Sequence, residues 1–243
     1  MAAKDIKEGE LIMEELPAVR CPPYTTKPIC LGCYTFIDKD NCLPCSKCGW
    51  PMCSEECCIK GDHLLECEVF KKAGFRVVYQ KFEYDTFEPL YDALTPIRML
   101  ALKQKRPKDW KNVKTLMAHL DEWKKDPKWI EEHELAMSFI LENVIMTDIS
   151  KDDILEMFGI GYINDFSTPI GDVKPRLCYP KVAMLSHDCT PNTVRVLQDI
   201  ANDNKIQVFA AKDIKKGEKL SISYVDLFQP GLIRREILKK VHK

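Results

Sequence analysis

The chain has no long apolar run, and no stretch of its 243 residues approaches the ~20 consecutive apolar residues of a membrane-spanning helix. It begins "MAAKDIKEGE", which is charged from the fourth residue and has no apolar segment of the kind found in secretory signals. Its charge is balanced, with 36 lysines and arginines against 37 aspartates and glutamates. These absences predict an intracellular protein, nuclear, cytoplasmic or both, that binds neither a membrane nor nucleic acid directly.

Several catalytic motifs are absent as well. The sequence contains no glycine-rich phosphate loop, no HExxH and no Ser-His-Asp order. The spacing of Ser221, Ser223 and His187 gives no support to a hydrolytic triad. The chemistry must therefore be sought elsewhere in the chain.

Cysteine, by contrast, is abundant: the chain has twelve, and nine fall between Cys30 and Cys67. Together with one histidine, eight ligands form four closely spaced pairs: Cys30 and Cys33, Cys45 and Cys48, Cys53 and Cys57, and His63 and Cys67. Thiols stay reduced inside cells, so the pairs favour metal over a disulfide-stapled loop, the alternative interpretation. Seven thiolates and one imidazole predict two closed, structural Zn²⁺ sites.

The same block contains three lysines, no arginine and six carboxylates. A zinc finger that reads DNA has the opposite charge balance. We therefore expect this block to support contacts with another protein.

Two phrases at opposite ends of the chain are nearly identical. Residues 2–10 read "AAKDIKEGE" and residues 210–218 read "AAKDIKKGE". Each predicts a strand, a turn at Gly9 or Gly217, and a second strand. One explanation of the repeat is coincidence between two common hairpin phrases, or a simple duplication. The alternative is that the two terminal hairpins meet in space, which predicts a β fold closed by its own ends.

The middle of the chain is helical by pattern. Apolar residues recur at helical spacing in three segments. The segments are 107–123 with Trp110, Val113, Met117 and Leu120; 134–146 with Met137, Ile140, Leu141, Val144 and Ile145; and 150–159, from Ser150 and Asp153 in capping-box register to Gly159. Alternation in "KIQVF" and "KLSISY" predicts strands after them.

The spacing of the metal ligands resembles that of a MYND zinc finger, in which the pairs interleave. The resemblance implies that Cys30, Cys33, Cys53 and Cys57 hold one ion and that Cys45, Cys48, His63 and Cys67 hold the other.

Two later phrases, "SHDCTPN" and "GEKLSISY", resemble the catalytic half of a SET domain. With the MYND block, the chain resembles the SMYD family of protein lysine methyltransferases, closest to the arthropod-specific, msta-type branch. The resemblance implies that Asn164, Ser186 and His187 contact S-adenosylmethionine, that Phe166 lines the lysine channel, and that Tyr224 is catalytic. A strand aromatic packed in the core is the alternative for Tyr224.

The fold class that follows is α+β: a β-rich SET core with a pseudoknot, interrupted by a two-zinc MYND finger and an α-helical insertion. The expected divisions are 1–28 and 146–228 for the core, 29–67 for the finger, 68–145 for the helical insertion, and 229–243 for the start of a truncated post-SET helix.

The sequence departs from the SMYD pattern in three places. Ser186 stands where the family has asparagine, no Gly-x-Gly precedes the first repeated phrase, and no cysteine follows Cys189 to complete a third zinc site. Cys189 is therefore expected to be a small buried residue. Each departure favours a chain without catalysis.

Two functions follow from the resemblance. The first is methyl transfer from S-adenosylmethionine to a protein lysine, with a histone among the candidate substrates and transcriptional repression as the implied process. The alternative is a non-catalytic interaction protein, whose MYND finger recruits a proline-containing partner such as a corepressor. A nucleic-acid-binding zinc protein is disfavoured by the charge balance.

Overall fold

The computed structural model describes residues 1–24, 26–78, 88–144, 149–167, 169, 172–197 and 204–241. The strands are β1 (Leu11–Glu15), β2 (Val19–Cys21), β3 (Leu43–Pro44), β4 (Pro51–Met52), β5 (Asp165–Ser167), β6 (Arg176–Cys178), β7 (Ser186–His187), β8 (Thr193–Leu197), β9 (Ile206–Ala210) and β10 (Ser221–Ile222). The helices are α1 (Glu55–Cys58), α2 (His63–Ala73), α3 (Glu88–Lys105), α4 (Pro107–Val113), α5 (Leu120–Trp123), α6 (Pro127–Asn143), α7 (Lys151–Asn164), α8 (Pro180–Ala183) and α9 (Gly231–Val241), with a 3-10 turn, η1, at Lys39–Asn41.

The two repeated phrases pair with each other. Ile6 forms an antiparallel bridge with its counterpart in the second phrase. The Asp5 carboxylate accepts a hydrogen bond from the backbone N–H of Lys216 at 2.8 Å, and Asp213 does the same for Glu8 at 3.0 Å. The repeat is therefore a local pseudo-twofold contact, and the prediction that the distant ends meet is confirmed.

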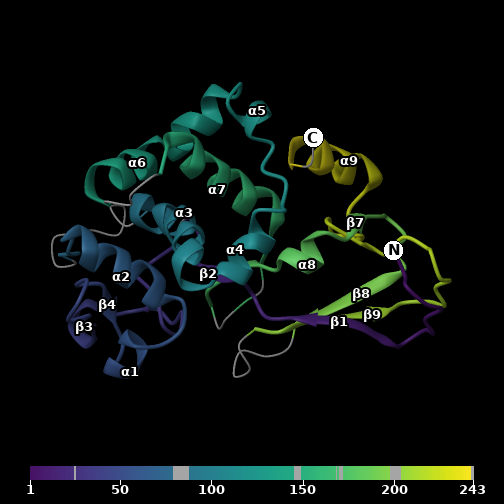
Figure 1. Cartoon of the computed structure of the whole chain (residues 1–243), viewed down its shortest axis with the longest axis horizontal. Coiled ribbons are helices and arrows are strands. Elements are labelled where there is room, and N and C mark those ends of the chain that lie inside the picture. Colours follow the sequence, from purple (N-terminus) through teal and green to yellow (C-terminus); the bar gives the residue numbers. More distant parts are fainter. Residues whose placement is uncertain are drawn as a thin grey trace.

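Beyond this contact, β1 pairs antiparallel with β9, and β9 pairs with β8 (Figure 1). Ile206, Val208 and Ala210 of β9 are buried, whereas the residues between them are only half-buried, which confirms the alternation in "KIQVF". A second sheet has the order β2-β6-β5. The predicted strand in "KLSISY" is reduced to β10, Ser221–Ile222.

The segment around "SHDCTPN" lies against the chain near Ser221. Strand β7 pairs parallel with β10, and the backbone N–H of Asp188 donates to the Ile222 carbonyl at 3.0 Å. The Asn192 side chain is buried and bonded to residues 218–221. Residues some thirty positions apart are thus joined in a knot-like arrangement.

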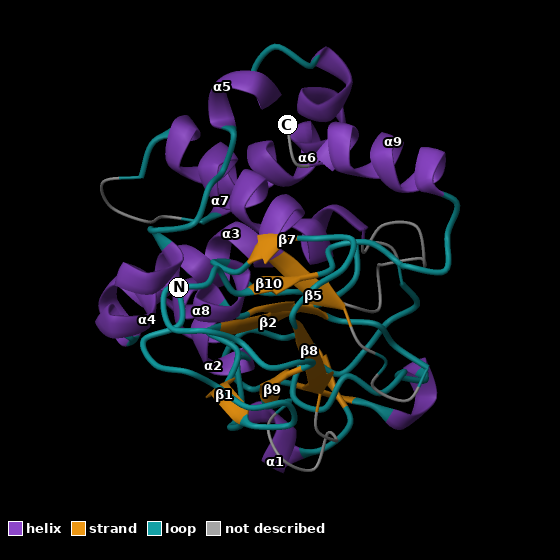
Figure 2. Ribbon diagram, turned by 90° about the vertical axis from the view of Figure 1, so that its right-hand side faces the viewer, coloured by secondary structure: helices purple, strands orange, loops and turns teal. Residues whose placement is uncertain are grey.

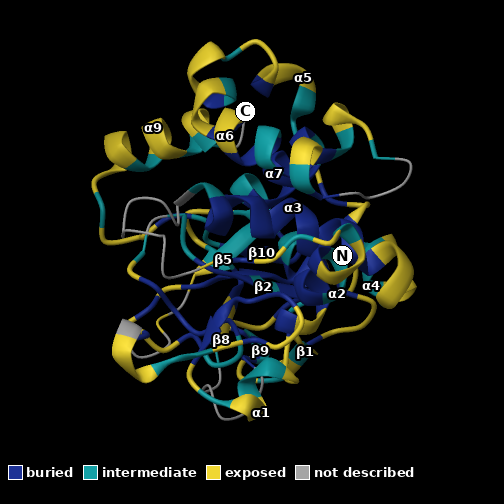
Figure 3. Cartoon of the chain, turned by 90° about the vertical axis from the view of Figure 1, so that its left-hand side faces the viewer, coloured by how far each residue is buried: buried dark blue, intermediate teal, exposed yellow. Residues whose placement is uncertain are grey.

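The longer helices lie together on one side of the strands (Figure 2). Helix α3 is among the most buried elements, whereas α9 has no buried residue (Figure 3). No helix in the described part of the chain combines the length and apolar character that a bilayer crossing requires.

The cysteine-rich segment shares a core with the helices. Trp50 is fully buried and stacks on Phe70 of α2, with ring centroids 6.5 Å apart. Its ring also contacts Tyr91 of α3, whose hydroxyl accepts a hydrogen bond from the Ile29 backbone N–H at 2.8 Å. Large aromatic side chains therefore join the finger to the helical insertion.

The prediction of one helix over 107–123 is wrong. Helix α4 ends at Val113, α5 begins at Leu120, and Met117 between them is 64% exposed. His119 has a left-handed φ of 48°, which no helix interior tolerates. The apolar spacing across 107–123 therefore belongs to two short helices and a turn.

The other two helices exist, with corrections. In α6, Met137 and Ile140 are buried as expected, but Leu141 is 53% exposed, and Ile145 lies outside the described residues. The capping box at Ser150 of α7 is confirmed. However, α7 does not stop at Gly159 but continues to Asn164. Gly159 lies in the helix interior and packs against the Ala118 backbone, with which a side chain at this position would collide.

A buried arginine joins the second sheet to the helices. The Arg176 guanidinium lies 3.6 Å from the centre of the Tyr24 ring, donates to the Pro22 carbonyl at 3.0 Å, and hydrogen-bonds Thr95 of α3. Its Nη1 atom is 3.7 Å from Oδ2 of Asp165. Burial raises the pKa of Asp165 to about 7, and the nearby arginine only partly opposes this shift.

This shift predicts a pH dependence of stability. Because the pKa of Asp165 is raised on folding, its contribution to the free energy of unfolding is full below pH ~4 and is lost as the pH rises to about 7. Between pH ~4 and 7, urea unfolding should show that the free energy of unfolding of wild type falls by a few kcal/mol relative to that of Asp165→Asn. Parallel curves for the two proteins would contradict the assignment, and Asp152→Asn, at an exposed site, should track wild type.

Candidate functional site

The first ligand set joins a loop, which contains Cys30 and Cys33, to the start of α1, with Cys53 just before this helix and Cys57 in it. The Sγ atom of Cys33 lies 3.5 Å from that of Cys53, which lies 3.5 Å from that of Cys57; Cys30 completes the set. The Cys57 N–H donates to the hydroxyl of Ser54, which caps the start of α1. This cap orients the ligand pair Cys53 and Cys57. Cys30 is buried but Cys53 is exposed, so this site reaches the surface.

The second set combines a tight turn with a helix. Cys45 and Cys48 flank the turn before β4, and His63 and Cys67 are one turn apart on α2. The Sγ atoms of Cys45 and Cys67 lie 3.8 Å apart, and His63 Nε2 lies 3.8 Å from Cys48 Sγ. All four residues are buried.

Both sets fit zinc. A tetrahedral site with Zn–S bonds of about 2.3 Å places two sulfurs ~3.8 Å apart, which is close to the separations in both sets. In each set the four ligand atoms lie within 4.8 Å of one another. No third group of this kind occurs among the described residues. The two interleaved sets implied by the MYND resemblance are therefore present.

Cys189 corrects the sequence interpretation, because it is exposed and not buried. It lies in a turn in which the Asp188 carboxylate accepts the Thr190 backbone N–H at 2.8 Å, and this turn projects the cysteine outward. Its Sγ atom is 3.4 Å from Nε2 of His187.

A cavity of about 530 Å³ opens beside the knot. Four of the five residues expected to bind donor or substrate line it: Asn164, Phe166, Ser186 and Tyr224. They come from the end of α7, from β5, from β7 and from the segment after β10. Chain segments some sixty residues apart thus converge on one space.

The fifth residue, His187, packs behind Tyr224. The Tyr224 backbone N–H donates to His187 Nδ1 at 3.0 Å, and the two ring centroids are 5.4 Å apart. Burial lowers the pKa of His187, so its neutral ring accepts at Nδ1 and carries its proton on Nε2. The Tyr224 hydroxyl donates to the Leu185 carbonyl at 2.6 Å, and burial raises its pKa, so the phenol stays neutral.

Backbone contacts orient the amide of Asn164, whose Nδ2 donates to the carbonyls of Met117 and Ile160 at 2.9 Å each. The Met117 contact depends on the turn between α4 and α5 that sequence periodicity did not predict. Sequence reasoning also missed Arg195 of β8, whose Cζ lies 5.1 Å from the centre of the Phe166 ring at the cavity wall. Its alternation with apolar neighbours in "TVRVL" was the available signal.

The sequence of the chain also matches a known family. A model of the SET domain family matches residues 1–225. The chain belongs to the SET domain family. The match runs through both repeated phrases and the knot, so the finger and the helical segments are insertions within one SET domain.

Curated relatives are SMYD-type proteins. The chain is 27% identical to "SET domain-containing protein SmydA-8, isoform A" of Drosophila melanogaster, covering 98% of the chain and 50% of the relative. It is 26% identical to "Histone-lysine N-methyltransferase ASHR1" of Arabidopsis thaliana, covering 98% and 49%. Identity to human "N-lysine methyltransferase SMYD2" is 23%, covering 85% and 47%. This SET domain spans about half the length of the curated relatives it matches.

Proposed function

We propose that this SET domain transfers a methyl group from S-adenosylmethionine to a lysine of a protein substrate. The observation that carries the proposal is the convergence of Asn164, Phe166, Ser186 and Tyr224 on one cavity of about 530 Å³. This volume is in the range of small-molecule sites. The sequence departures favoured a chain without catalysis, whereas the shared cavity supports methyl transfer.

The residues have separate tasks. Asn164 and Ser186, which line the cavity, would hold the donor, and His187 would support the cavity wall through its contact with the Tyr224 backbone N–H. The donor, when bound, supplies an electrophilic methyl group whose C–S bond breaks as the N–C bond forms. The lysine must first lose its proton to water, because an ammonium has no lone pair. Enclosure beside Phe166 lowers the pKa of the lysine and favours the neutral amine.

Tyr224 would position that amine. Its neutral hydroxyl lies at a fixed place because it is bonded to the Leu185 carbonyl. A hydroxyl oxygen accepts a hydrogen bond from an amine N–H, which directs the nitrogen lone pair along one line. The main effect of Tyr224 is therefore on orientation and rate.

Tyr224→Phe should lower the rate of methyl transfer by about a hundredfold or more, the scale typical of losing one positioned polar group. Calorimetric titration of S-adenosylmethionine should show saturable binding to both wild type and the variant, because the donor contacts remain. A labelled-methyl assay on a lysine-containing protein mixture measures the rate.

Tyr162→Phe is the matched control. Like Tyr224, Tyr162 is partly buried, but it lies on α7 and outside the cavity lining. Its activity should equal that of wild type. No donor binding by wild type, or transfer that does not depend on Tyr224, would overturn the proposal.

The proposal includes three finer assignments: the branch of the family, the substrate and the place of action. The wording "TPIRMLALKQ" and the similarity to a Drosophila SmydA protein support placement in the arthropod, msta-type branch. A histone substrate is supported by the similarity to the histone-lysine N-methyltransferase of Arabidopsis thaliana. Nuclear or cytoplasmic residence and a role in transcriptional repression remain predictions from the resemblance.

One observation favours the alternative, a finger that recruits a partner. A second cavity, of about 650 Å³, lies between the β1–β2 connection, α2 and the end of α3. Leu16 and Leu64 at its wall are 52% and 38% exposed, and Pro17 lies between β1 and β2. Binding of a proline-containing peptide that Leu64→Glu abolishes would support this function, and it is compatible with methyl transfer.

A further inference from the structure

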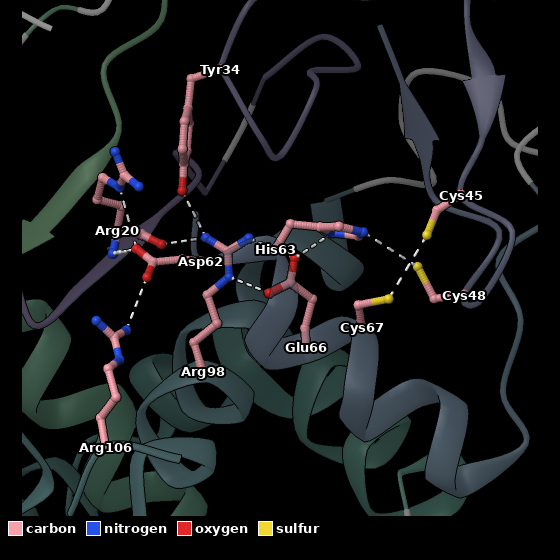
Figure 4. A network of polar contacts seen from close by, with 10 residues as sticks. All are labelled: Arg20, Tyr34, Cys45, Cys48, Asp62, His63, Glu66, Cys67, Arg98 and Arg106. Atoms are coloured by element: carbon pink, nitrogen blue, oxygen red, sulfur yellow. Dashed lines mark hydrogen bonds and ion pairs between the residues drawn. The ribbon is translucent and has the colours of Figure 1, made fainter. Parts of the chain in front are cut away.

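An arginine of the helical insertion lies beside the second metal site. Arg98 of α3 is fully buried, which is rare for a charged side chain. Its Nε and Nη2 atoms donate to the two carboxylate oxygens of Glu66 at 2.7 Å each (Figure 4). Such a paired contact fixes both position and orientation of the carboxylate.

Glu66 in turn contacts a metal ligand. Its Oε1 atom lies 3.0 Å from Nδ1 of His63, and the imidazole points its Nε2 at the thiols of the second site. A proton on Nδ1 leaves the Nε2 lone pair for the metal, and a carboxylate at Nδ1 holds the ring in that tautomer. His63, Glu66 and Arg98 are all inaccessible to solvent.

The remaining guanidinium nitrogen of Arg98 bonds Tyr34 and β2. Nη1 donates to the Tyr34 hydroxyl at 2.7 Å and to the carbonyl of Arg20 in β2. Tyr34 directly follows the ligand Cys33 and has a left-handed φ of 62°. Four hydrogen bonds of Arg98 thus connect α3 to β2, to Tyr34 and, through Glu66, to the second site.

We propose that Arg98 is a positioning residue for metal binding: through Glu66 it fixes the imidazole of His63, and so it couples occupancy of the second site to the packing of α3 on β2. Removing Arg98 leaves Glu66 as an uncompensated buried charge that no longer holds the ring. The inference stands on the metal site alone and is independent of the proposed methyl transfer.

The test uses the zinc-loaded full chain and measures the rate of zinc release to a chromogenic chelator. Release should occur in two phases, and Cys53→Ser, which removes an exposed ligand of the first set, identifies the phase of that site. Arg98→Met should accelerate release from the second site by about tenfold to a hundredfold, the scale for loss of a partner behind a ligand. Arg98→Lys and Glu66→Gln, which retain one polar contact, should give smaller accelerations.

Arg176→Met is the matched control, because Arg176 is also a buried, ion-paired arginine but contacts no metal ligand. It should lower the melting temperature without changing the release rate of the second site. Cobalt-loaded protein supplies a second readout: the ligand-field absorption of the second site should shift in Glu66→Gln and not in Arg176→Met. Equal release rates in Arg98→Met and wild type, or equal acceleration in the two arginine variants, would overturn the proposal.

Discussion

Removal of both metal ions is expected to unfold the segment from Ile29 to Cys67 while the β1-β9-β8 sheet keeps its structure. Before α2 begins at His63, the segment has little regular structure of its own, because β3 and β4 have two residues each and α1 has four. Binding of structural zinc contributes about 10–16 kcal/mol in finger peptides, which exceeds the stability of most domains. Hydrogen exchange measured by mass spectrometry, before and after chelation, should show lost protection across the segment.

The order of release is also predicted. Cys53 is exposed, whereas all ligands of the second set are buried, so a chelator should reach the first site sooner. Native mass spectrometry during chelation should therefore show a one-zinc species before the metal-free chain. The same chelator saturated with zinc beforehand is the control and should change nothing. Protection that persists across the segment in the metal-free chain would contradict a structural role for the ions.

Some of this arrangement follows from local sequence. Ligand pairs such as Cys45 and Cys48 have two residues between them, and His63 and Cys67 share a helix face, so spacing alone predicts that each pair turns toward one ion. The repeated phrases with Gly9 and Gly217 likewise predicted turns, and both glycines have positive φ. Short-range geometry is encoded where few residues decide it.

Long-range partners were not predictable in this way. Arg98 stands in an apolar helical run, and nothing nearby indicates that a carboxylate 32 residues earlier neutralises it. The break at His119 was hidden because the apolar residues of α4 and α5 happen to keep helical spacing across the turn. Tertiary contacts decided both cases, and local propensity is a weak guide there.

The cavity residues are an intermediate case. The family resemblance implies that Asn164, Ser186 and Tyr224 share one site. No periodicity in the sequence predicts that their segments meet. The knot brings Ser186 and Tyr224 together, whereas Asn164 is held beside them by its contacts with Met117 and Ile160. The hydrogen bonds of the knot can be tested one by one.

Asn192→Ala should lower the free energy of unfolding by about 3–5 kcal/mol, since it removes a hub of buried hydrogen bonds. Its Nδ2 atom donates to Glu218 Oε1 at 3.0 Å and to the Lys219 carbonyl at 2.8 Å, and its Oδ1 accepts the Ser221 N–H at 2.9 Å. Truncation leaves the buried Ser221 N–H and the partly buried Lys219 carbonyl without these side-chain partners. Equilibrium urea unfolding measures the loss, with Thr190→Ala in the exposed turn as a control expected within ~1 kcal/mol of wild type.

The position of the loss distinguishes a knot from ordinary packing. If Asn192 holds the two segments together, hydrogen exchange in Asn192→Ala should rise in both β7 and β10, which pair with each other, and leave α3 unchanged. The Tyr224 N–H, bonded to His187 across that pairing, should exchange faster as well. A variant as stable as wild type would show that the short β7–β10 pairing suffices, and that the Asn192 side chain does not hold the cavity wall in place.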